Sequence, residues 1–554
     1  MRRKVIMHVG PTNSGKTHHA LRALASAQVG VYAGPLRLLA YEIWERLNLG
    51  QIVPLGATDE EIAEAAKIGP SVDSPFARNC NMLTGEEQKI VSPSARLHSC
   101  TVEMLSLEMK FKVAVIDEIQ MISDRERGPG WTRAVLGLCA EELHLCGEET
   151  AVPLIEKMLR ETGDELVVKR YNRLTPLEVE EESLEGDLSR VRKGDCIVAF
   201  SRSAIFSLKS TVESKTNLKC AVVYGRLPPE VRSEQAALFN DPDSGYDVLI
   251  GSDAIGMGLN LKIRRVIFEA VAKFDGQGLK TLSVSQMKQI AGRAGRFGMQ
   301  GLDEKPGGFV TTLKAQDLPI LRKTLPLVIP PLEYARISND RPVFANLASV
   351  LPANASTETV FLAHMHAGRL PSYCRPSFPN MLETICQYLD EQGEFTLEDR
   401  ILFTQAPFPW RDNRGLHAIT AFVTSYWHNM HVDVMTSLER LPYLRLLDEA
   451  ETAMRAAGMK GAKAFNVRQN LLQLELFHKI LVVYLWLSFR NPVSYSSYGP
   501  ATDLKERLEV VLHWCLQEVT KYRAGDKPTT TLKKAPIEYK TRRQVYVERQ
   551  MEVD

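Results

Sequence analysis

The stretch VIMHVGPTNSGKTHHAL, residues 5–21, sets the fold class of the N-terminal part of this chain. Its apolar start, residues 5–9, predicts a buried parallel strand, because a short apolar run bounded by a turn signal is typical of one. A helix is predicted to continue over residues 18–27. A strand, a glycine-containing turn and a helix in this order form the first unit of a parallel sheet covered by helices.

The turn itself fits the Walker A pattern G-x-x-x-x-G-K-[ST]. Its fixed positions are Gly10, Gly15, Lys16 and Thr17, and its variable positions are Pro11, Thr12, Asn13 and Ser14. The backbone N–H groups of such a loop, together with the positive end of the helix, surround a polyphosphate. Lys16 is then expected to reach the β- and γ-phosphates, and the Thr17 hydroxyl to hold Mg²⁺. An ordinary glycine-rich turn is the alternative, and the strand and helix on either side argue against it.

The composition of the 554 residues is that of an ordinary globular protein. The net charge is +1, from 68 basic and 67 acidic residues, so any nucleic-acid surface must be local. The nine cysteines have no CxxC pair and no zinc-type spacing, which predicts reduced thiols, no disulfides and no structural metal. The longest apolar run, residues 480–489, is too short to span a bilayer, so we expect a buried helix and no membrane partner. The N-terminal MRRKVIM leads directly into the first strand, and no targeting peptide is expected in the chain as given.

Strand-like and helical segments alternate in two successive blocks. They predict two α/β domains with parallel sheets, at residues 1–165 and 166–325. After the proline-rich residues 324–331 the helical period dominates, which predicts helical domains over residues 326–522. Residues 523–554 are polar and basic, as in a flexible tail. The acidic residues 177–187 predict a solvated edge or linker.

A second motif supplies carboxylates to the first α/β domain. In VAVIDEIQ, residues 113–120, a buried apolar strand ends in Asp117 and Glu118. Asp117 at the carboxyl end of a parallel strand would complete the Mg²⁺ site, and Glu118 could polarise the attacking water. An apolar strand followed by two carboxylates is common by itself. In the same domain as a Walker A turn it points to nucleotide hydrolysis.

A third motif lies in the second α/β domain, in QIAGRAGRFG at residues 289–298. Gln289, Arg293 and Arg296 are spaced by four and three residues, which places them on one helical ridge. We expect the two arginines to neutralise charge that develops on the γ-phosphate, as fingers inserted from a second domain. A pair of surface arginines is the alternative, and the two other motifs disfavour it.

Together these motifs resemble those of the superfamily 2 helicases, and within them the mitochondrial degradosome RNA helicases, which are Ski2-like and DExH-related. The similar segments are GPTNSGKT, GPLRLLAYE at 34–42, DEIQ, VYGRLPPEVR at 223–232, SDAIGMGLNL at 252–261 and QIAGRAGRFG. They occur in the family's order over the two α/β domains. Fainter similarity continues at residues 397–408 and 474–492.

The resemblance implies two tandem RecA-like domains, the first binding ATP or another NTP with Mg²⁺, followed by helical domains. It implies 3′-to-5′ unwinding of RNA duplexes with single-stranded 3′ overhangs, for a 3′-to-5′ exoribonuclease in mitochondrial RNA turnover in the matrix. It adds Asp253 and Gly256 to the nucleotide site. The RNA contacts that it implies are Pro35, Arg37, Thr101, Val102, Ser201 and Arg202. The family usually has a targeting peptide and a further domain before the Walker A turn, and this chain departs from it there.

Other functions remain open at the level of sequence. A DNA helicase, or one that acts on both nucleic acids, would keep every motif. A kinase of small substrates would leave the second α/β domain without a role, and a scaffold without hydrolysis would predict a damaged Lys16 or Asp117–Glu118 pair. The DGQG turn at residues 275–278 predicts a β-hairpin. That hairpin is either a duplex splitter, as in related helicases, or a plain connection.

Overall fold

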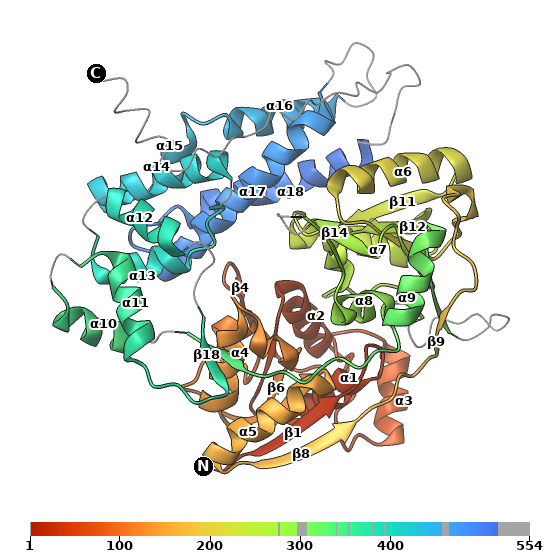
Figure 1. Cartoon of the computed structure of the whole chain (residues 1–554), viewed down its shortest axis with the longest axis horizontal. Helices are drawn as coiled ribbons and strands as arrows, with labels where there is room; N and C mark the ends of the chain where they lie inside the picture. The colour runs from red at the N-terminus through yellow and green to blue at the C-terminus, as the bar shows by residue number, and fades with distance from the viewer. Residues whose placement is uncertain are drawn as a thin grey trace. The chain divides into compact units, whose positions relative to one another are not determined.

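The computed structural model in Figure 1 describes residues 2–256, 258–274, 278–295, 307–338, 341–352, 355–377, 382–392, 395–410, 412–456 and 465–518. Arg296, the hairpin turn at 275–277 and the tail expected at 523–554 lie outside the described residues.

In the described part of the chain the first sheet has eight strands, in the order β4-β3-β5-β2-β6-β7-β1-β8. The strands are β1 (Lys4–Val9), β2 (Gly30–Gly34), β3 (Cys80–Leu83), β4 (Gln88–Lys89), β5 (Leu97–Thr101), β6 (Lys110–Ile116), β7 (Cys139–Gly147) and β8 (Glu165–Arg170). Among these described strands, all neighbouring pairs are parallel except β3 and β4, which are antiparallel. Because β8 pairs with β1 up to Arg170, this domain extends beyond the boundary expected at residue 165.

The helices of the first domain follow the strands in the α/β order that the sequence predicts. They are α1 (Lys16–Ser26), α2 (Arg37–Asn48), α3 (Asp59–Ile68), α4 (Gly128–Gly137) and α5 (Val152–Thr162), with 3₁₀ turns η1 (Val102–Met104), η2 (Ile119–Ser123) and η3 (Glu149–Ala151). Helix α1 begins at Lys16, two residues earlier than expected, because Gly15 adopts a left-handed conformation with φ 77° and ends the loop. The Walker lysine and threonine are therefore the first helical residues, where backbone N–H groups have no helical partner.

The second sheet is parallel throughout its described strands, in the order β11-β12-β10-β13-β16-β9. Its strands are β9 (Leu177–Val179), β10 (Asp195–Val198), β11 (Lys219–Val223), β12 (Tyr246–Gly251), β13 (Arg265–Phe268) and β16 (Gly308–Thr312). Its helical elements are α6 (Arg202–Thr216), α7 (Pro229–Asn240), α8 (Val284–Ala291), α9 (Leu318–Thr324), η4 (Leu188–Arg190), η5 (Asp253–Gly256) and η6 (Ala315–Asp317). A separate antiparallel pair, β14 (Ala272–Phe274) and β15 (Leu279–Thr281), forms the arms of the predicted hairpin.

The acidic segment at residues 177–187 has a more definite place than the solvated edge or linker that its composition predicts. It begins with β9, the edge strand of the second sheet. Glu180 then forms an ion pair with Arg265 at 3.1 Å, and Arg265 also pairs with the buried Asp195 at 2.6 Å. This segment therefore anchors the start of the second domain.

The C-terminal part is helical, as its periodicity predicts. It contains α10 (Arg341–Val350), α11 (Thr357–Ala367), α12 (Leu382–Gln392), α13 (Leu397–Gln405), α14 (Asn413–Asn429), α15 (Val434–Leu438), α16 (Tyr443–Arg455), α17 (Val467–Arg490) and α18 (Tyr498–Glu518), and the short strands β17 (Ala335–Ile337) and β18 (Cys374–Pro376). One apolar core joins helices α12 to α18 to the second domain, with Val222 and Ile250 in the same cluster as Phe422 and Leu481. The predicted fold class, tandem parallel-sheet domains followed by helices, is confirmed (Figure 1).

Helix α17 contains the apolar run at residues 480–489. By length and composition it could cross a membrane, but 72% of its most apolar window is buried inside the protein. It packs along α18 in the helical region (Figure 1). Its apolarity is therefore that of a core helix.

Candidate nucleotide site between the two parallel-sheet domains

The Walker A turn has the close packing and the unpaired polar atom expected of a phosphate cradle. A Cβ atom at Gly10 would lie 2.5 Å from the carbonyl oxygen of Tyr171, so no larger residue fits there. The hydroxyl oxygen of Ser14 is buried and has no hydrogen-bond partner. Lys16 Nζ donates to the Pro11 carbonyl at 3.1 Å, which places the ammonium over the loop. These features fit a polyphosphate, whose oxygens accept hydrogen bonds from hydroxyl, ammonium and backbone N–H groups.

Asp117 lies where the sequence predicts, at the carboxyl end of β6, beside the start of α1. Thr17 Oγ1 donates to Asp117 Oδ1 at 3.3 Å, and the Tyr32 hydroxyl donates to Oδ2 at 3.1 Å. The indole of Trp131 holds the Asp117 carbonyl at 2.9 Å. Burial, followed by the neighbouring Glu118 carboxylate, raises the pKa of Asp117 to about 6. A buried carboxylate and a hydroxyl at this spacing are ligands that Mg²⁺ prefers.

Glu118 is held in a chain of hydrogen bonds that reaches the second domain. Its backbone is left-handed, with φ 52°, and Gln120 Nε2 donates to its carboxylate at 2.5 Å. The side-chain oxygen of Gln120 accepts from the backbone N–H of Glu148 at 3.1 Å. The Glu148 carboxylate in turn accepts from Gln289 Nε2 at 3.3 Å. Gln289 is thus connected to the DEIQ segment through Glu148.

Glu148 is a site residue that our sequence reasoning missed. It follows Gly147, the last residue of β7, and β7 lies between β6 and β1 in the sheet. Burial raises the pKa of its carboxyl. The sequence contains a signal for Glu148, because polar residues that directly follow neighbouring parallel strands gather at the same edge of the sheet.

Arg293 lies on the second domain with its guanidinium turned toward η5. Its Nε donates to the Gly256 carbonyl at 3.1 Å and its Nη1 to the Leu259 carbonyl at 3.3 Å. Its side chain is half-buried, and burial lowers its pKa. The predicted nucleotide residue Asp253, also on η5, forms an ion pair with Lys273 on the hairpin at 3.1 Å. Arg293 therefore connects the 289–295 segment to η5, which bears both nucleotide residues that the resemblance adds.

The two halves of the site touch directly. Asn13 Nδ2, in the Walker A turn, donates to the Gly295 carbonyl at 2.7 Å. A Cβ atom at Gly292 would lie 1.9 Å from Thr12 Oγ1, so this contact requires glycine. The structure thus brings together the Walker A turn, the DEIQ segment and the 289–295 segment. The predicted helical ridge is wrong, because α8 ends at Ala291 and Arg293 lies beyond it.

The two arginines among the residues expected to contact RNA are paired with acids. Arg37 forms ion pairs with Glu86 at 2.9 Å, with Glu87 at 3.4 Å and with Glu230 of the second domain. Arg202 pairs with Glu475 of α17 at 3.2 Å.

The four other expected RNA contacts have mainly structural neighbours. Ser201 caps α6, accepting from the Ala204 N–H at 3.1 Å. Pro35 is buried after β2 and Val102 is buried at the start of η1, whereas Thr101, the last residue of β5, is partly exposed. Only Thr101 and Ser201 of these four offer a hydroxyl group to a nucleic-acid backbone.

Glu230, His478 and Glu509 lie close enough to hold a metal ion among the described residues. Lys505 Nζ, however, is 2.7 Å from Glu509 and 3.3 Å from Glu230. Burial lowers the pKa of His478 to about 3. We therefore interpret the cluster as an ion-pair network that joins α7, α17 and α18.

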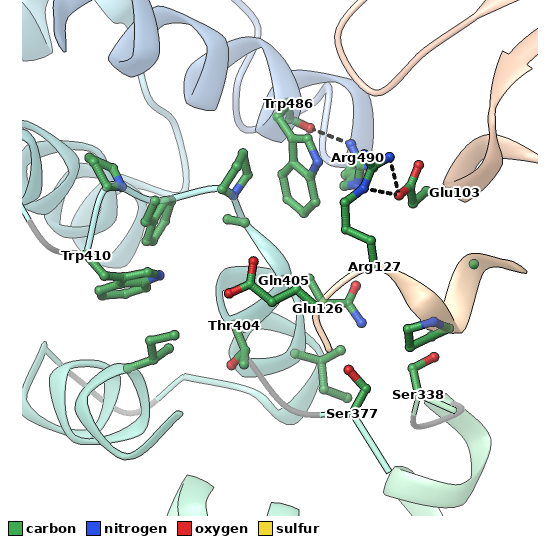
Figure 2. Close-up of a pocket in the computed structure, with 18 of the residues that line it drawn as sticks. Glu103, Glu126, Arg127, Ser338, Ser377, Thr404, Gln405, Trp410, Trp486 and Arg490 are labelled. Carbon is green, nitrogen blue, oxygen red and sulfur yellow. Dashed lines mark hydrogen bonds and ion pairs between the residues drawn. The ribbon is translucent and has the colours of Figure 1, made fainter. Parts of the chain in front are cut away.

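A cavity of about 1020 Å³ opens between the first domain and the helical region. Figure 2 shows Trp410 and Trp486, from the helical region, and Arg127, from the first domain, around it. Arg490 lies 3.6 Å from the ring centroid of Trp486. Glu103, which follows the expected RNA contact Val102, also lines the cavity.

Comparisons with known proteins match three parts of the chain. Residues 1–171 match the DEXQ-box helicase domain of Suv3, residues 180–298 the helicase conserved C-terminal domain, and residues 471–518 the ATP-dependent RNA helicase SUV3 C-terminal domain. The first two matches meet in the segment between β8 and the residues after β9.

Similar proteins include relatives from plants and fungi. The mitochondrial ATP-dependent RNA helicase SUV3 of Oryza sativa is 39% identical, over 93% of this chain and 80% of that protein. SUV3 of Saccharomyces cerevisiae is 36% identical, over 95% of this chain and 67% of that protein. The chain spans only 56% of Arabidopsis thaliana DExH18, to which it is 40% identical over 88% of its own length, and 59% of Oryza sativa SUV3L.

Proposed function

The chain belongs to the SUV3 family of ATP-dependent RNA helicases, and we propose that it hydrolyses ATP between its two RecA-like domains to unwind RNA. The observation that carries the proposal is the meeting of the Walker A turn with the 292–295 segment, seen in the bond from Asn13 to Gly295. A motor of this class needs one nucleotide site shared by two domains, because closure and opening around the nucleotide move the bound strand.

Each side chain of the site has a role in this proposal. Lys16 compensates charge on the β- and γ-phosphates, and Thr17 and Asp117 would hold Mg²⁺. When bound, Mg²⁺ would neutralise negative charge on the phosphates. Glu118 accepts a proton from the attacking water, and its hydrogen bond from Gln120 keeps its carboxylate oriented.

The second domain contributes the remaining groups. Gln289 of the second domain donates a hydrogen bond to Glu148 of the first domain, a contact that requires the two domains to be closed. Arg293 keeps η5 in register with the 289–295 segment, and Arg296 is assigned to the γ-phosphate by its place in the motif. These groups should act only when the two domains are closed.

We place the single strand along the first-domain loop at Thr101 and into the cavity of Figure 2. Two observations support this path. The indoles of Trp410 and Trp486 offer flat faces on which bases of any sequence can stack. Arg127 and Lys479 supply positive charge to the same cavity. Arg37 and Arg202 would exchange their carboxylate partners for RNA phosphates.

The hairpin β14–β15 is placed at the fork between duplex and single strand. Phe274 and Leu279 face each other across the hairpin and are 68% and 80% exposed. Exposed apolar side chains at this position can stack against an opening base pair.

The relatives are named mitochondrial RNA helicases, and we extend to this chain a place in mitochondrial RNA turnover. Unwinding in the 3′-to-5′ direction would supply single-stranded 3′ ends to a 3′-to-5′ exoribonuclease. The test is the decay rate of a stem-loop RNA by such a nuclease, with and without this protein and ATP. An unchanged rate would contradict this role.

The primary experiment compares strand separation on matched RNA and DNA duplexes that carry a 3′ overhang, a 5′ overhang or blunt ends. We expect ATP-dependent unwinding of the RNA duplex with a 3′ overhang and RNA-stimulated ATP hydrolysis. Unwinding of DNA alone would favour a DNA helicase. Hydrolysis that no nucleic acid stimulates would refute the motor.

A further inference from the structure

The segment at residues 171–175, between β8 of the first sheet and β9 of the second, lies against the nucleotide site. The Tyr171 N–H donates to the Val9 carbonyl at 2.9 Å, and the Leu174 N–H donates to the Asn13 carbonyl at 3.0 Å. These backbone hydrogen bonds hold the linker, residues 171–175, alongside the Walker A turn. The linker contains none of the motifs from which the activity is proposed.

Arg173 extends from this linker to both halves of the site. Its Nη1 donates to the Thr12 carbonyl at 3.2 Å and to the Gly292 carbonyl at 2.9 Å. Its Nη2 donates to the Ala294 carbonyl, and its Nε to the Thr175 carbonyl at 2.8 Å. One planar guanidinium thus fixes the distance between the Walker A turn and the segment that bears Arg293.

Thr175, two residues after Arg173, also connects the Walker A turn with the 292–295 segment. Its buried hydroxyl donates to the Gly295 carbonyl and accepts from Asn13 Nδ2 at 2.9 Å. The linker, the Walker A turn and the 292–295 segment therefore share one hydrogen-bond network.

We infer that Arg173, supported by Thr175, is a positioning residue that aligns the second domain's part of the nucleotide site with the Walker A turn. The inference rests on the proposed ATP hydrolysis. The guanidinium donates to backbone carbonyls on both domains, so it holds the closed arrangement whatever side chains surround it. Misplacement of catalytic groups by about 1 Å can lower a rate on the order of 10²-fold, so loss of this alignment should reduce turnover.

The test compares Arg173→Gln with Arg170→Gln in the full chain. Arg170→Gln is a matched control, because it removes the same charge from a residue three positions before Arg173. Arg170 forms an exposed ion pair with Glu149, in which the side chains are 61% and 62% exposed. We measure kcat and KM for ATP with and without a 3′-tailed RNA, together with Tm. For Arg173→Gln we expect RNA-stimulated kcat to fall about ten- to a hundredfold, with KM changed by less than about threefold.

The small KM change is expected because the backbone bonds of Tyr171 and Leu174 still hold the Walker A turn. Arg170→Gln should retain wild-type kcat and KM. Arg173→Lys should stay impaired, since an ammonium cannot donate to carbonyls on both domains in the fixed planar arrangement of a guanidinium. Wild-type kcat in a folded Arg173→Gln protein would overturn the inference.

A double variant separates alignment from general destabilisation. If Arg173 acts through the segment that bears Arg293, then Arg173→Gln should cost little further kcat in an Arg293→Lys background. Fully additive losses would overturn the inference. If Arg173→Gln lowers Tm so far that it cannot be assayed, Thr175→Val decides, because it removes only the bridging hydroxyl. It should show the same loss of kcat at unchanged KM, and a normal kcat would refute the role.

Absence of ATP hydrolysis by the wild-type protein would instead refute the proposed function itself. The two failures are therefore distinguishable.

Discussion

At the scale of single residues, we expect Lys16 and Glu118 to have separable roles, because Lys16 contacts the Walker A turn and Glu118 lies beside Asp117, the proposed Mg²⁺ ligand. Glu118→Gln keeps the size of the side chain and leaves Asp117 in place. We expect hydrolysis to fall about 10²- to 10⁴-fold, as for loss of a general base, while nucleotide and RNA still bind. The measurements are single-turnover hydrolysis and equilibrium binding of a fluorescent nucleotide.

Lys16→Ala is the comparison for that variant. The loop backbone remains, but the charge at the β- and γ-phosphates is uncompensated, so hydrolysis should be lost together with most nucleotide affinity. Turnover within about tenfold of wild type, only about 1.4 kcal/mol of barrier, would refute the Walker A assignment. Equal loss of binding in both variants would show that the proposed division of roles is wrong.

At the scale of elements, the hairpin β14–β15 can be tested without disturbing the core, since Phe274 and Leu279 are exposed. The double variant Phe274→Ser/Leu279→Ser should keep RNA-stimulated ATP hydrolysis and lose most duplex unwinding. Val328→Ser is the control, because Val328 is also apolar and is 90% exposed. Normal unwinding by the double variant would favour the plain connection.

Helix α17 offers a second test at this scale. Trp486→Leu removes a stacking face from the cavity but keeps an apolar side chain, so single-stranded RNA should bind about five- to a hundredfold more weakly, the value of one stacked base. Trp427→Leu on α14, at an exposed position outside the cavity, should bind RNA normally. Filter binding of a poly-pyrimidine RNA provides the measurement. Equal affinities of the two variants would exclude the cavity from the RNA path.

At the scale of the whole molecule, the proposed activity requires the second domain to close on the first. Arg293→Lys should lower RNA-stimulated turnover at least about tenfold, because an ammonium cannot hold the Gly256 and Leu259 carbonyls as the guanidinium does. Arg296→Lys, outside the described residues, is expected to do the same. RNA affinity without nucleotide should change little in either variant.

The control for these arginine variants is Arg322→Lys. Arg322 also donates to two backbone carbonyls, those of Glu180 and Glu181 at 2.9 and 2.8 Å, but both carbonyls belong to the second domain and neither is a residue of the proposed nucleotide site. The Arg322→Lys variant should hydrolyse ATP at the wild-type rate. RNA-stimulated turnover that is normal in both Arg293→Lys and Arg296→Lys would mean that closure does not depend on this pair.

The sequence by itself determined the parts of this protein whose geometry is local. The Walker A turn and the strand that ends at Asp117 are each encoded within a few contiguous residues, because backbone conformation and apolar period are short-range properties. Their order along the chain was enough to predict two parallel-sheet domains followed by helices. The boundary at residue 165 fell inside β8, because the short segment ELVVKR is recognised as a strand only through its pairing with β1.

Tertiary structure alone decided how these parts are connected. Glu148 and Arg173 gain their importance from partners far away in the sequence, Gln289 and Gly292, and no local pattern specifies such pairs. The same holds for Arg37, whose partner Glu230 belongs to the other domain. Packing of whole domains sets these distances, and a hydrogen bond or ion pair forms only when long-range packing brings its two groups within about 3 Å.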